Sequence, residues 1–437
     1  MSEIVIVISD LYLPPDTLEV ARSVHAIGVT GRSATAASRA ESPGAAAAGA
    51  TSRSGAAASH AERPAAAVGA TQATQGASPL AGLEHIARYG HRRTLEAEGG
   101  WRPWLARALS RADLADIPPA IVVAQSPSPP APAAATDSPS RQAPAAAIDS
   151  PSPPVPTAAT DLSAPSAPMA RTAWLATPLH LIPSLTTVHL DRRSLLRLSS
   201  AEAEGFATDF NQTFRDPDPA ASLQLHPLPS GEFLLEAPAS FEATTTEPAR
   251  ALVVGLESSL PRGPRATTFK RLGAELEMWL HAHPLNEARR RRGELPSSTL
   301  WLWGGGPFFP VQTSSAQSAP RVIAYGNDPY LVGLATLSGA TIRKLPDSLA
   351  DETDPVSRVV LVSEVTPRLH ANPHWTVVDA VADIDRRFLS PALTALNTGR
   401  VETVTLIANN LEVQLRRSDR LKFWRPRQSG LTGLIPR

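Results

Sequence analysis

Short apolar runs of strand length recur along the chain, separated by polar residues and by stretches in which apolar residues have helical spacing. The runs lie at residues 4–9, 321–325, 340–345, 358–362, 401–407 and 411–415. Helical spacing is found over residues 329–337 and 372–396, and Asn372 followed by Pro373 is expected to begin the second of these helices. Strands that alternate with helices predict an α/β fold with a mostly parallel, doubly wound sheet and a terminal antiparallel edge.

The middle of the chain has a different pattern, typical of a smaller α+β unit. Ser199 and Ser200, followed by acidic residues, favour the start of a helix. Two apolar segments, residues 223–226 and 233–235, flank a Pro-Ser-Gly turn and predict a β-hairpin. Farther along, residues 269–283 place their apolar side chains on one face and predict an amphipathic helix.

The stretch that follows this helix, residues 283–306, combines several signals. Pro284 suits a first helical position, and four arginines at residues 289–292 fall in the last turn before Gly293. Residues 300–303 form an unbroken apolar run, which predicts a central strand of the sheet, covered on both faces. Three glycines follow, where the carboxyl end of that strand is expected to open into a loop. Ligands of parallel α/β sheets bind outside such carboxyl ends, so we expect the functional site here.

Two tracts have a composition that cannot bury enough apolar surface to become ordered. Residues 31–79 are rich in Ala, Gly, Ser and Thr, and residues 125–168 are rich in Pro, Ala and Ser, with APAAATDSPS recurring as APAAAIDSPS. We predict that both tracts are disordered. The chain is accordingly divided into a first strand with the start of the α/β core (1–30), a disordered insertion (31–79), a helical part of the core (80–124), a disordered linker (125–168), a smaller α+β domain (169–265) and the main α/β core (266–437).

Composition and charge exclude several classes of function. Lys plus Arg and Asp plus Glu both number 41, so no net charge attracts nucleic acid or an anionic membrane. The absence of cysteine excludes disulfides, thiolate nucleophiles and cysteine-based zinc sites. No apolar run approaches the roughly 18 residues of a membrane span, and the N-terminus lacks the pattern of a signal peptide. We expect a soluble, cytoplasmic protein that binds neither nucleic acid nor membranes.

Eight positions within residues 283–306 form a motif with fixed spacing, and they are His283, Pro284, Asn286, Arg289, Gly293, Pro296, Gly304 and Gly306. This motif resembles HPxNxxRxxxGxxPxNxxxxxGxG, the pattern of the cofactor-independent, archaeal-type phosphoglycerate mutases of the alkaline phosphatase superfamily. Its WLWGGG ending resembles a bacterial branch of that family, the RpfE-type regulatory proteins. Two positions depart from the pattern, because Ser298 stands where the family usually has Asn and Trp303 where the mutases often have Arg.

The resemblance implies a phosphotransfer centre with two divalent metals, manganese or zinc, held by Asp and His side chains. Asp10, at the end of the first strand, and His370 match two of the expected ligands. Thr366 stands where the family has Asp, and residues 408–410 (Ala-Asn-Asn) stand where it has Asp-His. The expected nucleophile falls within residues 31–79 and is not assigned. Nearby carboxylates that are close enough to act as substitutes are Glu364, Asp379, Asp383 and Asp385.

These losses favour a non-catalytic, phosphoglycerate-mutase-like regulatory or binding protein with a degenerate metal site, no catalytic residue and no cofactor. The alternative is a metal-dependent phosphoglycerate mutase or phosphohydrolase. A third possibility is a nucleotide-binding protein that uses the glycines as a phosphate cradle, although Pro307 follows them at once and the P-loop lysine is missing.

The expected partner is an unknown protein or a small anionic ligand. For the anion, the candidate site is formed by Asn286, Arg289, Gly304, Gly305 and Gly306. Arg289 has an equally good structural explanation, because a cation in the last turn complements the partial negative charge of a helix C-terminus.

Overall fold

The computed structural model describes residues 2–13, 78–95, 100–125, 171–185, 187–218, 221–313, 322–352, 356–408, 410–422, 424–426 and 430–434. The two tracts for which disorder is predicted, residues 31–79 and 125–168, lie outside the described residues apart from residues 78–79 and 125.

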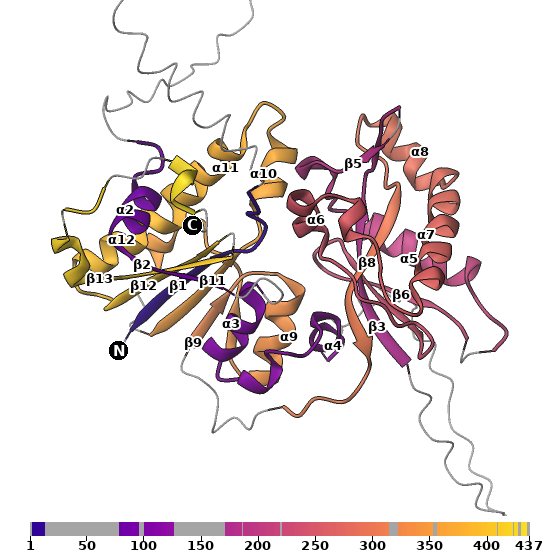
Figure 1. Cartoon of the computed structure of the whole chain (residues 1–437), viewed down its shortest axis with the longest axis horizontal. Coiled ribbons are helices and arrows are strands. Elements are labelled where there is room, and N and C mark those ends of the chain that lie inside the picture. Colours follow the sequence, from indigo (N-terminus) through magenta and orange to yellow (C-terminus); the bar gives the residue numbers. More distant parts are fainter. Residues whose placement is uncertain are drawn as a thin grey trace, which may run out of the picture.

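The larger of the two main sheets has seven strands in the order β10-β9-β11-β1-β12-β13-β2 (Figure 1). Its strands are β1 (Glu3–Ile8), β2 (His91–Thr94), β9 (Val322–Tyr325), β10 (Thr341–Arg343), β11 (Ser357–Val362), β12 (Thr403–Ala408) and β13 (Leu411–Arg416). The pairs from β10 to β12 are parallel, and β13 and β2 close the sheet as an antiparallel edge. The predicted mostly parallel sheet is therefore confirmed, although β2 was not foreseen.

Helices cover both faces of this sheet, because alternate residues of its strands point to opposite sides. Ile4, Ile6 and Ile8 of β1 face a core that includes α2 (Ala81–Tyr89), α10 (Val365–Ala371), α11 (Val377–Ile384) and α12 (Ser390–Asn397). Val5 and Val7 face the other core, which includes α3 (Trp101–Ala108), α4 (Pro119–Ala124) and α9 (Pro329–Ser338). Figure 1 shows the two groups of helices above and below the sheet.

The long helix predicted over residues 372–396 is wrong only in its start, because the helical backbone runs without interruption from Val377 to Asn397. α10 ends before Asn372, and α11 begins after Thr376, whose side chain accepts the N–H of Asp379 in a capping box. A threonine with a partner three residues later is a stronger start signal than Asn372 next to Pro373. Between α11 and α12 the backbone forms a π-helix over Asp385–Leu389.

A second, antiparallel sheet has four strands in the order β6-β7-β3-β8. These are β3 (Arg171–Leu179), β6 (Gln224–Pro227), β7 (Phe233–Pro238) and β8 (Thr299–Pro307). The predicted hairpin is confirmed as β6 and β7. The prediction that residues 300–303 form a central strand of the parallel sheet is wrong, because they lie in β8, at the end of this antiparallel sheet.

The helices around the second sheet explain why β8 is apolar on both faces. Leu300 and Leu302 pack against α5 (Ser200–Thr213) and α7 (Ala266–His281), whereas Trp303 joins the core around α4. α8 (Pro284–Arg291) follows α7 directly, and α6 (Pro248–Val254) precedes α7 in the chain. The last strand of the second sheet therefore ends at Pro307, and the next strand along the chain, β9, belongs to the larger sheet.

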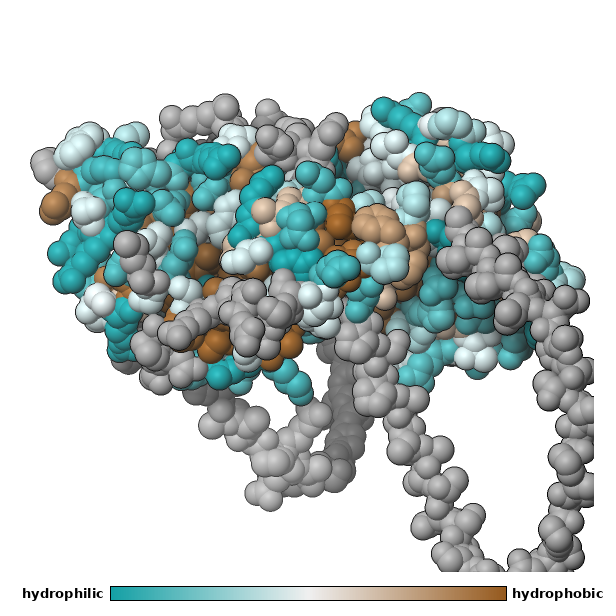
Figure 2. Space-filling view, turned by 90° about the horizontal axis from the view of Figure 1, so that it is seen from below, coloured by the Kyte–Doolittle hydropathy of each residue, from teal (hydrophilic) through white to brown (hydrophobic). Residues whose placement is uncertain are grey.

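The surface is mixed in character. A two-stranded ribbon, β4 (Ile182–Pro183) and β5 (Val188–His189), projects from the second unit. Seen from below, hydrophilic residues cover both flanks and apolar residues gather near the middle (Figure 2). Within the described residues, no helix is both long and apolar enough to cross a membrane.

Candidate functional site

Asn286, the first candidate for anion binding, is buried and fully engaged by the backbone. Its amide nitrogen donates to the carbonyl oxygens of Leu280 at 2.7 Å and Ser297 at 2.8 Å. Its amide oxygen accepts the N–H of Ser297 at 2.8 Å. The side chain therefore fixes the turn between α8 and β8, and buried amides that are satisfied in this way are structural.

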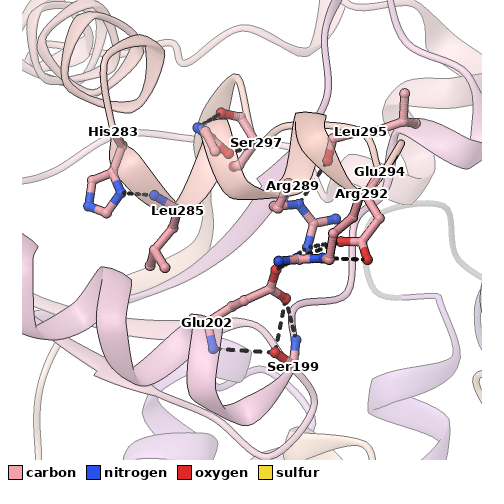
Figure 3. Close-up of polar contacts among 10 residues, drawn as sticks. Ser199, Glu202, His283, Leu285, Arg289, Arg292, Glu294, Leu295 and Ser297 are labelled. Atoms are coloured by element: carbon pink, nitrogen blue, oxygen red, sulfur yellow. Dashed lines mark hydrogen bonds and ion pairs between the residues drawn. The ribbon is translucent and has the colours of Figure 1, made fainter.

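Arg289 is engaged in the same manner, and Figure 3 shows its guanidinium directed at protein groups. Nη1 lies 2.9 Å from Glu202 Oε1, and Nε donates to the carbonyl of Leu295 at 2.9 Å. Burial works against the charge of Glu202, but the N–H of Ser199 and then Arg289 outweigh it and hold the pKa of Glu202 below its ordinary value. Glu202 thus joins the cap of α5 to α8, and Arg289 is an internal cross-link.

The three glycines lie within β8 and not in a loop. Gly306 pairs with Ala173 of β3, and a Cβ on Gly305 would approach the Ala173 carbonyl oxygen to 2.2 Å. Gly304 has φ of +61° and donates its N–H to Thr245 Oγ1 at 3.2 Å. Glycine is needed here because β8 passes close to β3. The phosphate-cradle explanation is therefore not supported at these residues.

Asp10 lies at the carboxyl end of β1, as predicted, but its carboxylate accepts hydrogen bonds from the first turn of α10. Oδ1 accepts the N–H of Val365 at 3.3 Å and Oδ2 accepts the N–H of Thr366 at 2.8 Å. Both residues are in the first turn of α10, where backbone N–H groups have no partner within the helix. Asp10, only 9% exposed, thus caps α10 from a distant strand.

His370, the second metal candidate, is also occupied. Its Nε2 lies 2.8 Å from the carbonyl oxygen of Arg193, and since a carbonyl only accepts, Nε2 carries the proton. Burial, which the Arg193 carbonyl only partly offsets, lowers the pKa of His370 and favours the neutral ring. Nothing in these contacts brings His370 and Asp10 onto a common centre.

The four carboxylates considered as substitute ligands have other partners. Glu364 lies between Arg368 at 2.6 Å and Arg387 at 2.5 Å. Asp379 completes the capping box of α11, and Asp383 pairs with Arg368 and Arg386. Asp385 accepts the N–H of Leu83 at 2.6 Å and the hydroxyl of Ser390 at 2.6 Å. Across the described residues, no group of three or more His, Asp and Glu side chains is placed to hold a metal, so these residues do not fit a two-metal centre.

A cavity of about 90 Å³ lies instead where the carboxyl ends of the parallel strands meet the second unit. Ser9 and Asp10 follow β1, and Ser363 follows β11 with its hydroxyl 2.7 Å from that of Ser9. Asp328 follows β9 and caps α9 through the N–H groups of Tyr330 and Leu331. Sequence reasoning missed Asp328, although an Asp-Pro pair after a strand and before a helix is a start signal at the functional edge of a sheet.

Arg102 forms one wall of this cavity, held in a cluster of aromatic rings. Its guanidinium carbon lies 4.5 Å from the ring centroid of Trp101, 4.8 Å from Trp303 and 5.9 Å from Tyr330. It also makes a bidentate pair with Glu247, at 2.7 and 2.9 Å. Burial opposes the charge of Arg102, but Glu247 outweighs it, so the pKa of Arg102 lies above its ordinary value.

Burial has a larger effect on the pKa of the Asp328 carboxyl than the neighbouring charges and hydrogen bonds have. It raises the pKa of the Asp328 carboxyl, and the nearby Arg102 offsets this only in part. A carboxyl whose ionised form is disfavoured in a cleft is a frequent feature of ligand-binding and catalytic sites.

Three arginines of the segment after β5 connect the second unit to the same edge of the sheet. Arg192 donates to the carbonyl oxygens of Asp10 and Tyr12. Arg193 donates to three carbonyls around the end of α10, those of Leu369 at 2.7 Å, Pro373 at 2.7 Å and Trp375 at 3.1 Å. Arg197 donates to the carbonyl of Ser363 at 3.2 Å. We call Arg192, Arg193 and Arg197 the arginine clamp.

No family model and no curated protein sequence matches this chain. Among solved structures, it is similar to a cofactor-independent phosphoglycerate mutase from Thermoplasma acidophilum DSM 1728, with 15% identity and a TM-score of 0.26, over 57% of this chain and 67% of that protein. It is also similar to the PH0037 protein from Pyrococcus horikoshii, with 13% identity and a TM-score of 0.26, over 56% of this chain and 64% of that protein, less than two thirds of its length. Similarity at this level establishes no function.

Proposed function

We propose that this is a cytoplasmic, non-catalytic binding or regulatory protein on a phosphoglycerate-mutase-like scaffold, in the manner of the RpfE-type proteins that its motif resembles. The observation that carries the proposal is the pair of hydrogen bonds that the Asp10 carboxylate accepts. Both oxygens of Asp10 accept backbone N–H groups of α10, and among the described residues this carboxylate belongs to no group of three or more His, Asp and Glu side chains that could hold a metal. Asp10, which matches the first metal ligand that the resemblance implies, caps the N-terminus of α10.

The arginine clamp gives independent support. A two-metal phosphotransfer site concentrates carboxylates and imidazoles around the ions. Here the same edge of the sheet has guanidinium groups of Arg192 and Arg193 bonded to backbone carbonyls, and Nε2 of His370 donates to the carbonyl oxygen of Arg193. These contacts join the two units and position the cleft, which suits a binding protein.

Turnover measurements test this proposal. The full-length protein is assayed for interconversion of 2- and 3-phosphoglycerate and for hydrolysis of a phosphomonoester, with manganese or zinc added. We expect no turnover above that of the same buffer with metal alone. Turnover that Asp10→Ala abolishes would overturn the proposal and support the metal-dependent mutase or phosphohydrolase instead.

A further inference from the structure

A basic segment begins at the end of β13, on the side of the molecule away from the second unit (Figure 1). Between residues 416 and 425 the chain carries one carboxylate, that of Asp419, and five cationic side chains, those of Arg416, Arg417, Arg420, Lys422 and Arg425. Arg88 of α2 adds a sixth cation, because its Nε donates to the carbonyl oxygen of Arg425 at 3.0 Å. We call these six cationic residues the basic edge.

The 3₁₀-helix η7 (Arg417–Leu421) gives this segment an inner and an outer side. With three residues per turn, Asp419 and Lys422 lie in the same row. Asp419 is only 4% exposed, and its Oδ1 lies 2.6 Å from Lys422 Nζ. Arg425 donates to two carbonyl oxygens at the end of α2, at 3.0 and 2.7 Å. These inner contacts hold the segment against α2 and neutralise the Asp419 carboxylate.

The outer side of the segment combines positive charge with apolar side chains. Arg417 and Arg420 share another row of η7 and are both exposed, and the one carboxylate of the segment is taken by Lys422. Leu421 and Trp424, three residues apart, are 67% and 70% exposed. A single exposed apolar side chain is common, whereas two of this size beside several cations indicate an interaction surface.

The equal totals of acidic and basic residues in the whole chain do not cancel this local excess. At physiological ionic strength, exposed charges that are farther apart than about 8 Å are largely screened from each other. An anion at the basic edge therefore meets the positive charges there and few of the acidic groups elsewhere. A local attraction for anions is compatible with the neutral composition, on which the expectation of no membrane binding rests.

The apolar side chains select among anionic partners. Guanidinium groups bind the phosphate oxygens of lipids and of nucleic acids alike. A nucleic acid would stack a base on the Trp424 ring but offers little to Leu421, whose aliphatic side chain has no stacking face. A membrane surface takes both, because tryptophan and leucine insert at the boundary between headgroups and acyl chains while neighbouring arginines contact anionic headgroups.

We infer that the basic edge, together with Leu421 and Trp424, binds the surface of a membrane that contains anionic phospholipids. The contact is peripheral and made by a few side chains, consistent with the finding that no helix of the described residues is suited to cross a membrane. Each basic residue close to such a surface strengthens binding roughly fivefold. The inference goes beyond the proposed function, because it concerns a surface separate from the cleft.

Co-sedimentation of the full-length protein with lipid vesicles tests the inference. Vesicles of phosphatidylcholine alone are compared with vesicles of phosphatidylcholine mixed with phosphatidylserine. We expect binding to the mixed vesicles that weakens as salt is added, and none to phosphatidylcholine alone. Arg417→Gln combined with Arg420→Gln should weaken binding roughly 25-fold, at roughly fivefold for each arginine. Leu421→Ala combined with Trp424→Ala keeps the charge and should weaken binding roughly tenfold.

Arg271→Gln combined with Arg291→Gln is the matched control. It removes the same charge from exposed arginines of α7 and α8 that pair with glutamates, and it is expected to leave vesicle binding unchanged. Thermal melting confirms that each variant is folded.

Three results with vesicles would overturn the inference. They are equal binding to both kinds of vesicle or to neither, a control variant that weakens binding as much as the changes at Arg417 and Arg420, and no effect of Leu421→Ala with Trp424→Ala. Binding of a DNA or RNA oligonucleotide in place of the mixed vesicles would also overturn it and identify a nucleic acid as the partner. The phosphoglycerate assay reports on the cleft, so the proposed function and this inference can fail independently.

Discussion

Replacing Asp10 by alanine distinguishes a structural carboxylate from a functional one. The substitution removes the acceptor for the N–H groups of Val365 and Thr366, which are 0% and 3% exposed. Each buried N–H without a partner costs about 1–3 kcal/mol, and the longer 3.3 Å bond to Val365 places it at the lower end. We therefore expect Asp10→Ala to lower the free energy of unfolding by about 2–4 kcal/mol.

Asp10→Asn keeps one carbonyl oxygen and is expected to cost about half as much. Asp351→Ala, at an exposed carboxylate, is the control and is expected to change stability by less than about 0.5 kcal/mol. Urea unfolding, followed by far-ultraviolet circular dichroism, gives the midpoint and the slope for each variant. An Asp10→Ala protein as stable as the wild type, or more stable, would refute the reasoning, since carboxylates that are kept for function often reduce stability.

Three other substitutions test parts of the account. Trp303→Ala removes a buried ring that stacks on Arg102 and should cost about 3–5 kcal/mol, whereas Trp424→Ala, at a residue that is 70% exposed, should cost far less in the same urea titration. Burial lowers the pKa of His283, although Asp209 partly offsets this effect. Protonation therefore favours the unfolded chain, and the free energy of unfolding should fall as the pH drops through about 6.5. His283→Asn keeps an acceptor for the N–H of Leu285 and should flatten that part of the curve of stability against pH. Asp385→Ala leaves the N–H of Leu83 and the Ser390 hydroxyl without their acceptor and should cost about 2–4 kcal/mol, and hydrogen exchange in α2 should rise; unchanged exchange there would contradict the assigned contact.

Much of the parallel sheet was predictable because its signals are local. β1, β9, β11 and β12 are short apolar runs, and the helices between them have periodic apolar faces, so pattern alone finds them. The cap of α5 at Ser199 with Glu202 was predictable for the same reason, since the two residues are three apart.

The candidate site was less predictable because its contacts join distant parts of the chain. Residues 300–303 are apolar on both faces, as expected of a central strand, but an antiparallel strand between α7 and α4 has the same pattern. Arg289 finds its partner in Glu202, 87 residues away, which no spacing rule reveals. Asp10 was correctly placed at a strand end, yet only the fold shows that the first turn of α10 lies against it.

The metal content of the purified full-length protein tests the central claim most directly. The protein is incubated with an excess of manganese or zinc, dialysed, and analysed for bound metal per chain, with Asp10→Ala treated in parallel. If the Asp10 carboxylate is a helix cap and the cleft contains no two-metal centre, both proteins retain less than one metal ion per chain. Two tightly bound ions in the wild type, lost in Asp10→Ala, would contradict the account.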